Sequence, residues 1–303
     1  MNGRGVALAL VAGLGLASTL LAAACGGHSS APGVADATKI ATHVLGHAPT
    51  GLAKTIIARG TLEVADDANY APQRYIDDSG KLVGFDVDVA KKTAAYLGLK
   101  IHIQNPQWDS VPTGLSAGRY DVSIGSMRVT AELQDTIDFT NPYYYTQSQC
   151  IVRQGSSPYT DVASMTGKKI GVVAQTTDYD FLTAAKGPVV KTYNDDADLF
   201  LDLKNGLIDG AVTSDLTLGQ AAASGYHFVL SGPPYFYEPM AFAIRKGQTD
   251  LLALLNYAIK KMHHDGCLTK YAKTWYHGAD PTQAPSADIP SYLELMATLG
   301  ATP

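Results

Sequence analysis

The sequence predicts an α/β fold built on mostly parallel sheets, and three observations carry this prediction. From Thr61 onward, short β-prone runs alternate with amphipathic helical runs, an order typical of parallel sheets flanked by helices. The alternation comes in two successive series, one before and one after residue 150. About 270 residues follow the N-terminal leader, which is enough for two compact lobes or one large domain.

Residues 1–24 have the layout of a secretory signal peptide, because Arg4 precedes an apolar run that ends in small residues. The alternative is a transmembrane helix, since the run approaches the ~20 residues that span a bilayer. The Cys-Gly-Gly that ends the run, in place of basic residues, favours the signal. LAAAC resembles a bacterial lipobox, although Leu21 stands one place early. We therefore expect residues 25–49 to be a lipidated Cys25 and a flexible tether, which anchors the protein outside the cytoplasm.

The first series of elements spans residues 61–152. An apolar stripe at Phe85, Val89 and Ala90 predicts a helix that ends at Gly98. The expected strands are TLEVAD, KIHIQ and YDVSIG. The expected helices are FDVDVAKKTAAYLG and SVPTGLSAG. The aromatic run DFTNPYYYTQSQCIV is expected to be a strand that crosses from one lobe to another.

The second series spans residues 168–278 and repeats the alternation. The expected strands are KKIGVV, VVKTY, IDGAVTS and HFVL, with PPYFYEPMAFAIR as a return crossing. The expected helices are TTDYDFLTAAKG, DADLFLDLKNG, LTLGQAAASG, TDLLALLNYAIKKMHHDG and LTKYAKTWYHG. The tail after Pro281 contains Pro and Ser and is expected to be peripheral.

Charge and motifs exclude several classes of function. The net charge is −5 and no basic stripe is present, so nucleic acid is not an expected partner. The nucleophile elbow, the zincin motif, C-x-x-C and the P-loop are absent from the sequence. His263 and His264 are neighbours on a helix and point in different directions, so they make a poor metal pair. We expect no metal, no cofactor and no catalytic residue.

Several blocks, in order, resemble the solute-binding proteins (family 3) of polar amino acid ABC transporters: GTLEVADDANYAP, GKLVGFDVDVAKKTAAYLG, WDSVPTGLSAGRYDVSIGSM, DFTNPYYY, GKKIGVVAQTT and LKNGLIDGAVTS. The resemblance implies a two-lobed periplasmic-binding-protein-like fold (type II), with two hinge strands and a small polar ligand held between the lobes. Lobe one would comprise residues 50–150 and 236–278, lobe two residues 151–235, and the tail residues 279–303. The partners it implies are the ligand and the permease of the transporter, with the protein itself a monomer.

The resemblance also places residues at the ligand. Asp67 and Tyr70 match positions where an acid meets the ligand's cationic group and a ring covers it. The alternative for Asp67 is a solvated turn. Trp108 matches a second aromatic wall, or packs at a helix start. Thr176 and Thr177 match a site that holds an anion at a helix start, which is compatible with plain N-capping.

Two departures from the family pattern concern the ligand's carboxylate and amino group. The usual clamp arginine is Leu133 here, and Arg128 stands where a small hydroxyl is expected. Arg128 is predicted to bind a carboxylate from this new position, and Ser126, two residues before it, is also predicted to contact the ligand. The alternative for Arg128 is a surface arginine paired with Glu132 or Asp135. The second departure is V-T-S-D in place of V-T-D. The resemblance implies that the Asp of V-T-D holds the ligand's amino group; here Ser214 stands in the position of that Asp, and Asp215 follows it.

Three further expectations follow from the sequence. Cys150 and Cys267 are expected to form a disulfide outside the cytoplasm, the alternative being two small buried residues. The main function expected is capture of an amino acid or a related amine or carboxylate for an ABC importer. The alternatives are a dehydratase of the cyclohexadienyl type on the same fold and a sensing lipoprotein without transport.

Overall fold

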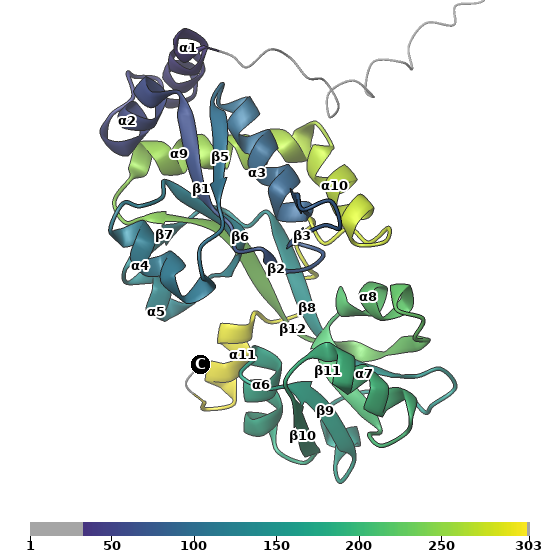
Figure 1. The fold of residues 1–303 in the computed structure, drawn as a ribbon. Helices are drawn as coiled ribbons and strands as arrows, with labels where there is room; N and C mark the ends of the chain where they lie inside the picture. Colours follow the sequence, from purple (N-terminus) through teal and green to yellow (C-terminus); the bar gives the residue numbers. More distant parts are fainter. Residues whose placement is uncertain (1–32, 302–303) are drawn as a thin grey trace, which may run out of the picture.

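The computed structural model describes residues 33–301, which form two lobes joined by two long strands (Figure 1). The strands are β8 (Tyr144–Arg153) and β12 (Phe228–Arg245), which pair antiparallel and run through both lobes. The crossing points predicted near residues 150 and 235 fall inside these two strands. The signal peptide, the lipobox and Cys25 lie outside the described residues.

Lobe one contains three parallel strands, β1 (Thr61–Ala65), β5 (Lys100–Gln104) and β6 (Val122–Arg128), with β7 (Ile137–Phe139) paired to β12. A separate small sheet follows β1. Its strands are β2 (Asn69–Tyr70), β3 (Arg74–Ile76) and β4 (Leu82–Val83). The helices of this lobe are α1 (Val34–Leu45), α2 (Gly51–Arg59), α3 (Phe85–Tyr96), the 3-10 helix Trp108–Ser110, α4 (Val111–Ser116), α5 (Ala131–Gln134), α9 (Thr249–His264) and α10 (Cys267–Trp275).

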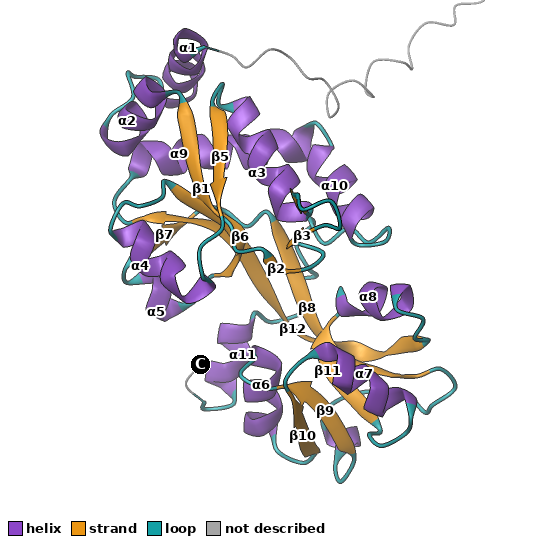
Figure 2. Ribbon diagram, in the orientation of Figure 1, coloured by secondary structure: helices purple, strands orange, loops and turns teal. Residues whose placement is uncertain are grey.

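Lobe two contains a second parallel set, β9 (Lys169–Val173), β10 (Val189–Tyr193) and β11 (Gly210–Ser214). Its helices are the 3-10 helix Ala163–Met165, α6 (Thr177–Ala185), α7 (Asp196–Lys204), α8 (Thr217–Ala223) and α11 (Tyr292–Thr298). The continuous strand order is β10-β9-β11-β8-β12-β6-β1-β5, so a parallel set flanks each side of the two shared strands (Figure 2). The predicted two-lobed α/β fold is confirmed, but the parallel strands of the two lobes belong to one continuous sheet, because the antiparallel strands β8 and β12 join them.

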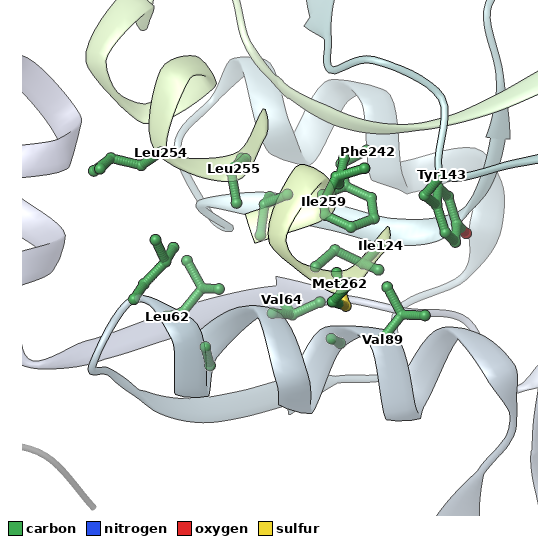
Figure 3. Close-up of a cluster of buried hydrophobic side chains, with 14 of the residues drawn as sticks. Leu62, Val64, Val89, Ile124, Tyr143, Phe242, Leu254, Leu255, Ile259 and Met262 are labelled. Atoms are coloured by element: carbon green, nitrogen blue, oxygen red, sulfur yellow. The ribbon is translucent and has the colours of Figure 1, made fainter. Parts of the chain in front are cut away.

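Successive side chains of a strand point to opposite faces of the sheet, and this divides the lobe-one core into two layers. Val64 belongs to the cluster that faces α3 and α9, whereas the next residue, Ala65, belongs to a cluster with α4. Phe242 and Ala243 divide in the same way on β12, as the pleat of a strand requires. Figure 3 shows the larger layer, in which Leu255, Ile259 and Met262 of α9 pack over the strands.

Two predicted peripheral segments are folded, which corrects the sequence interpretation. Residues 34–45, expected in the tether, form α1, which buries Ala37 and Ala41 and contacts α9. The C-terminal tail, expected to be peripheral, forms α11, whose Tyr292 and Met296 are buried in the lobe-two core. Figure 1 shows α11 beside α6, at the end of lobe two that faces lobe one.

The predicted disulfide between Cys150 and Cys267 is absent, because Cys150 is a buried free thiol. Its side chain packs in a lobe-two cluster, whereas Cys267 packs in the main cluster of lobe one. The prediction was wrong because β8 continues into lobe two, so that residue 150 lies on the far side of the junction from α10. Burial raises the pKa of the Cys150 thiol to about 12, which makes it unreactive at neutral pH.

Candidate functional site

The carboxyl ends of β1 and β6 lie at one edge of the lobe-one sheet, because the two strands are parallel. Asp67 follows β1 closely and is buried, so the solvated turn considered for it does not form. Arg128 is the last residue of β6, and Trp108 opens the 3-10 helix after β5. Tyr70, in the hairpin after β1, keeps 45% of its surface exposed. The structure thus gathers the predicted lobe-one contacts at one edge.

A residue that the sequence analysis did not single out, Arg74, contacts both predicted ligand-facing rings. Its guanidinium carbon lies 5.2 Å from the centre of the Tyr70 ring and 4.9 Å from that of the Trp108 ring. Both distances are within the range of cation–π attraction. We call the Tyr70 and Trp108 rings the aromatic box.

Two buried carboxylates hold the Arg74 guanidinium. Its Nε lies 3.1 Å from Asp66 Oδ1, and its Nη1 donates to Asp86 Oδ2 at 3.1 Å. Asp86 also accepts hydrogen bonds from the hydroxyls of Ser126 (2.6 Å) and Tyr143 (2.5 Å). Burial raises the pKa of Asp86, but Arg74 and these two hydroxyls oppose the rise, so Asp86 rather than Asp66 holds the negative charge.

The carboxyl of Asp66 is in the opposite situation. Burial, and then the nearby charge of Asp86, raise the pKa of Asp66 to about 9, although Arg74 opposes the shift. Among the described residues, neither oxygen of Asp66 accepts a hydrogen bond of good geometry. Asp66 therefore holds a proton at neutral pH, and the group formed by Arg74, Asp66 and Asp86 is electrically balanced.

Ser126, predicted to contact ligand, is a member of this buried network. Its Oγ donates to Asp86, accepts from the Tyr144 hydroxyl at 2.7 Å, and its backbone N–H donates to the Tyr143 hydroxyl at 3.0 Å. These contacts hold Ser126 at a φ of 51°, in the left-handed region that residues other than glycine seldom adopt. Ser126 thus helps to hold Asp86, the carboxylate that pairs with Arg74.

Arg128 pairs with a residue on a hinge strand. Its Nη1 donates to Glu238 Oε1 on β12 at 3.2 Å, so neither Glu132 nor Asp135, the partners of the surface alternative, takes this role. The side chain of Arg128 remains 40% exposed, and Glu238, Tyr70 and Asp178 all lie within its electrostatic range. The remaining N–H groups of the guanidinium have no acceptor among the described residues, so they are available to an anion.

Two acidic groups near Arg128 are Asp178 of lobe two and Glu238 of the hinge strand β12. Asp178, in the first turn of α6, accepts a hydrogen bond from the Ser148 hydroxyl of β8. Burial raises the pKa of Asp178 to about 7 and the charge of Glu238 adds to the rise, whereas Ser148 and Arg128 oppose it. Burial also raises the pKa of Glu238, against the pull of Arg128 and of the Thr177 hydroxyl. The predicted residue Thr177 therefore joins the site through Glu238.

The other predicted lobe-two residues form hydrogen bonds with nearby backbone groups. Thr176 caps α6, accepting from the Tyr179 N–H at 3.2 Å. Asp215 accepts from the Gln147 N–H at 3.0 Å and donates its own N–H to the Gln147 carbonyl at 2.8 Å, which ties β11 to β8. Ser214 accepts from the Leu216 N–H at 3.3 Å. Contact of Thr176, Ser214 and Asp215 with the ligand stays a prediction.

The side chains that the structure brings together between the lobes are Tyr70 and Arg128 from lobe one, Glu238 from the hinge, and Thr177 and Asp178 from lobe two. Glu238 and Asp178 were missed, and one signal pointed to Asp178: it directly follows the predicted pair Thr176 and Thr177. Among the described residues, no group of three or more His, Cys, Asp or Glu side chains is arranged to hold a metal ion.

Two α/β lobes that share two strands and face each other with charged and aromatic side chains define the class of two-lobed solute-binding proteins. More specifically, the chain belongs to the bacterial extracellular solute-binding proteins, family 3, whose model matches residues 62–278. This confirms the family that the sequence motifs indicated. In the described part of the chain, no helix has the length and apolarity needed to cross a membrane.

Relatives with different named ligands share this fold. The L-cystine-binding protein TcyJ of Escherichia coli K12 is 32% identical over 239 residues, which cover 78% of this chain and 90% of TcyJ. The L-cystine solute receptor of Neisseria gonorrhoeae, solved unliganded and open, has a TM-score of 0.68 and 26% identity and covers 78% of this chain and 100% of the receptor. An ancestral cationic amino acid solute-binding protein, AncCDT-1, has a TM-score of 0.65 and 30% identity over 73% of this chain and 98% of its own.

Proposed function

We propose that this protein captures an amino acid, or a related amine or carboxylate, between its lobes and delivers it to the permease of an ABC importer. The observation that carries the proposal is the pairing of opposite charges across the junction: Arg128 on one lobe, Glu238 on the hinge and Asp178 on the other lobe. The family is named for solute binding, and two relatives are named for binding L-cystine and cationic amino acids, which supports the same conclusion.

The two charges suit the two ends of a zwitterion. The free N–H groups of Arg128 pair with the ligand's carboxylate, for which a planar guanidinium is well shaped. Asp178 and Glu238 meet the ligand's ammonium group, whose positive charge favours their ionised forms. Tyr70 covers the ligand with its exposed surface. The protein acts outside the cytoplasm, as members of its family do, and we propose Cys25 as its lipid anchor.

A thermal-shift screen of amino acids, amines and organic acids on the purified protein tests this function. A true ligand at a hundred times its Kd adds roughly 2.7 kcal/mol to the free energy of unfolding. We expect Arg128→Ala to weaken binding of that ligand, measured by calorimetry, by on the order of 2–5 kcal/mol, or thirty-fold to several thousand-fold. Arg128→Lys should also bind worse, because an ammonium group lacks the two-pronged geometry.

Arg119→Ala is the matched control, since Arg119 is an exposed arginine of the same lobe. It should bind the ligand as the wild type does. An Arg128→Ala protein that binds within about twofold of the wild type, well under 1 kcal/mol, would show that Arg128 has no part in recognition.

One observation favours a second function, dehydration of a cyclic acid. AncCDT-1 is described as a precursor of cyclohexadienyl dehydratase. A carboxyl whose pKa is about 7, as at Asp178, can donate a proton to a departing hydroxyl at neutral pH. Turnover of prephenate-like acids, lost in Asp178→Asn, would establish this alternative. We favour capture, because the named relatives bind their ligands and the same carboxyl can meet an ammonium group.

A further inference from the structure

The interaction of Arg74 with the aromatic box is the feature that the capture of a zwitterion leaves unexplained. The residue is only 4% exposed, and its guanidinium meets the Tyr70 ring, the Trp108 ring and two carboxylates at once. Two aromatic rings with carboxylates behind them form an environment that attracts a cation. Here a side chain of the protein itself supplies that cation.

The local backbone is built to keep Arg74 in this place. Arg74 opens β3 and lies opposite Tyr70 in the hairpin register, so one side of the box comes from the neighbouring strand. Gly125 on β6 leaves the room that the group needs. A Cβ at Gly125 would lie 3.5 Å from the Arg74 guanidinium carbon, 3.4 Å from the Trp108 ring and 3.3 Å from Asp66.

The charges of this group are already balanced. Asp86 receives Arg74, Ser126 and Tyr143, and Asp66 holds a proton, so neither of the two carboxyl groups that hold Arg74 is left for a second cation. A ligand ammonium or guanidinium entering the box would meet the positive charge of Arg74, at a cost that burial increases.

We propose that Arg74 is a specificity-determining residue that fills the aromatic box, so that the protein rejects amino acids with a cationic side chain and accepts those with an uncharged one. The ligand then lies on the outer side of the box, where Tyr70 is exposed and Arg128 is within reach. This inference rests on the proposed function of amino-acid capture. It separates this protein from AncCDT-1, which is named for cationic amino acids.

The experiment compares binding of L-arginine, L-lysine, L-glutamine and L-cystine to the wild type and to Arg74→Ala by calorimetry and thermal shift. The wild type should bind an uncharged member of this panel at least tenfold more tightly than L-arginine. Arg74→Ala opens the box and leaves the Asp86 carboxylate without its cation, so the variant should gain at least tenfold in affinity for L-arginine. Arg119→Ala, the surface control, should leave the ranking of the wild type unchanged.

Two results would overturn the inference: a wild type that binds L-arginine as tightly as the uncharged amino acids, or a folded Arg74→Ala protein that gains no affinity for L-arginine. If Arg74→Ala fails to fold, Arg74→Gln replaces it, because its amide still donates a hydrogen bond within the box. Failure of the proposed function looks different. In that case no amino acid stabilises the wild type, whereas a gain of L-arginine binding in the Arg74 variant still shows that the box had been filled.

Discussion

Asp178 shows two opposed electrostatic effects on a single residue. It lies in the first turn of α6, where the free backbone N–H groups of a helix normally stabilise a carboxylate. Burial and the neighbouring charge of Glu238 nevertheless raise its pKa to about 7. Desolvation is the larger effect here. Without ligand, the site therefore carries a carboxylate that is only partly ionised at neutral pH.

Asp178 makes the stability of the protein depend on pH. Its folded pKa of about 7 lies above the unfolded value of about 3.9, so the folded state binds the proton more tightly. The stabilisation from this proton is complete below pH ~4 and is lost as the pH rises to ~7, with a slope of at most about 1.4 kcal/mol per pH unit. Asp178→Asn, which cannot ionise, should remove this component and be more stable than the wild type by about 1–3 kcal/mol at pH 8.

Urea unfolding at pH 4.5, 6 and 8 measures this effect without ligand. Asp198→Asn is the matched control, because Asp198 is an exposed acid in the first turn of α7. It should leave the pH dependence of the wild type unchanged. Parallel stability curves for the wild type and Asp178→Asn would contradict the prediction.

Sequence reasoning singled out the residues that local motifs mark, such as Tyr70, Trp108 and Arg128. It missed the partners that the fold brings from a distance. Glu238 is 110 residues from Arg128, and no local pattern connects them. Arg74 stands in a turn-rich stretch, where an arginine is ordinarily a surface residue, and only the structure shows that Asp66 and Asp86 hold it.

At the scale of elements, the strands and helices of the two series were predicted well because their apolar periodicity is strong. The strands HFVL and PPYFYEPMAFAIR were expected as two pieces, yet they form the single strand β12 with an irregular register between Ser231 and Phe236. The missed helix α11 had a readable signal, the capping box of Ser291 and Glu294, which the Pro-rich context obscured.

Helix α11 is predicted to be part of the stable core of lobe two. Met296 is buried in the same cluster as Phe181 and Phe236, so Met296→Ala should lower the free energy of unfolding by about 2–5 kcal/mol. Leu299→Ala is the control on the same segment, because Leu299 is exposed and should cost far less. Equal urea midpoints for the two variants would show that α11 does not support the lobe.

At the scale of the whole molecule, the lobes are linked by β8, β12 and the segment that leads to α11. That segment lies along the shared strands: Tyr145 of β8 donates its N–H to Pro281 O at 2.9 Å, and Tyr237 of β12 donates to Pro290 O at 3.0 Å. Each lobe has hydrophobic clusters of its own. This division lets the lobes move as bodies about the shared strands without disturbing either core.

Ligand binding is therefore predicted to draw the two lobes together. A zwitterion that pairs with Arg128 on one lobe and Asp178 on the other interacts fully with both only when the lobes approach, so its differential affinity favours the closed form. In solution scattering, saturation with the screened ligand should reduce the radius of gyration toward the ~19 Å of a compact chain of this length. Arg128→Ala at the same ligand concentration should show no decrease, because one of the two contacts is lost, whereas Arg119→Ala should contract as the wild type does. A radius that stays constant while calorimetry shows saturation would mean that the ligand binds to one lobe alone.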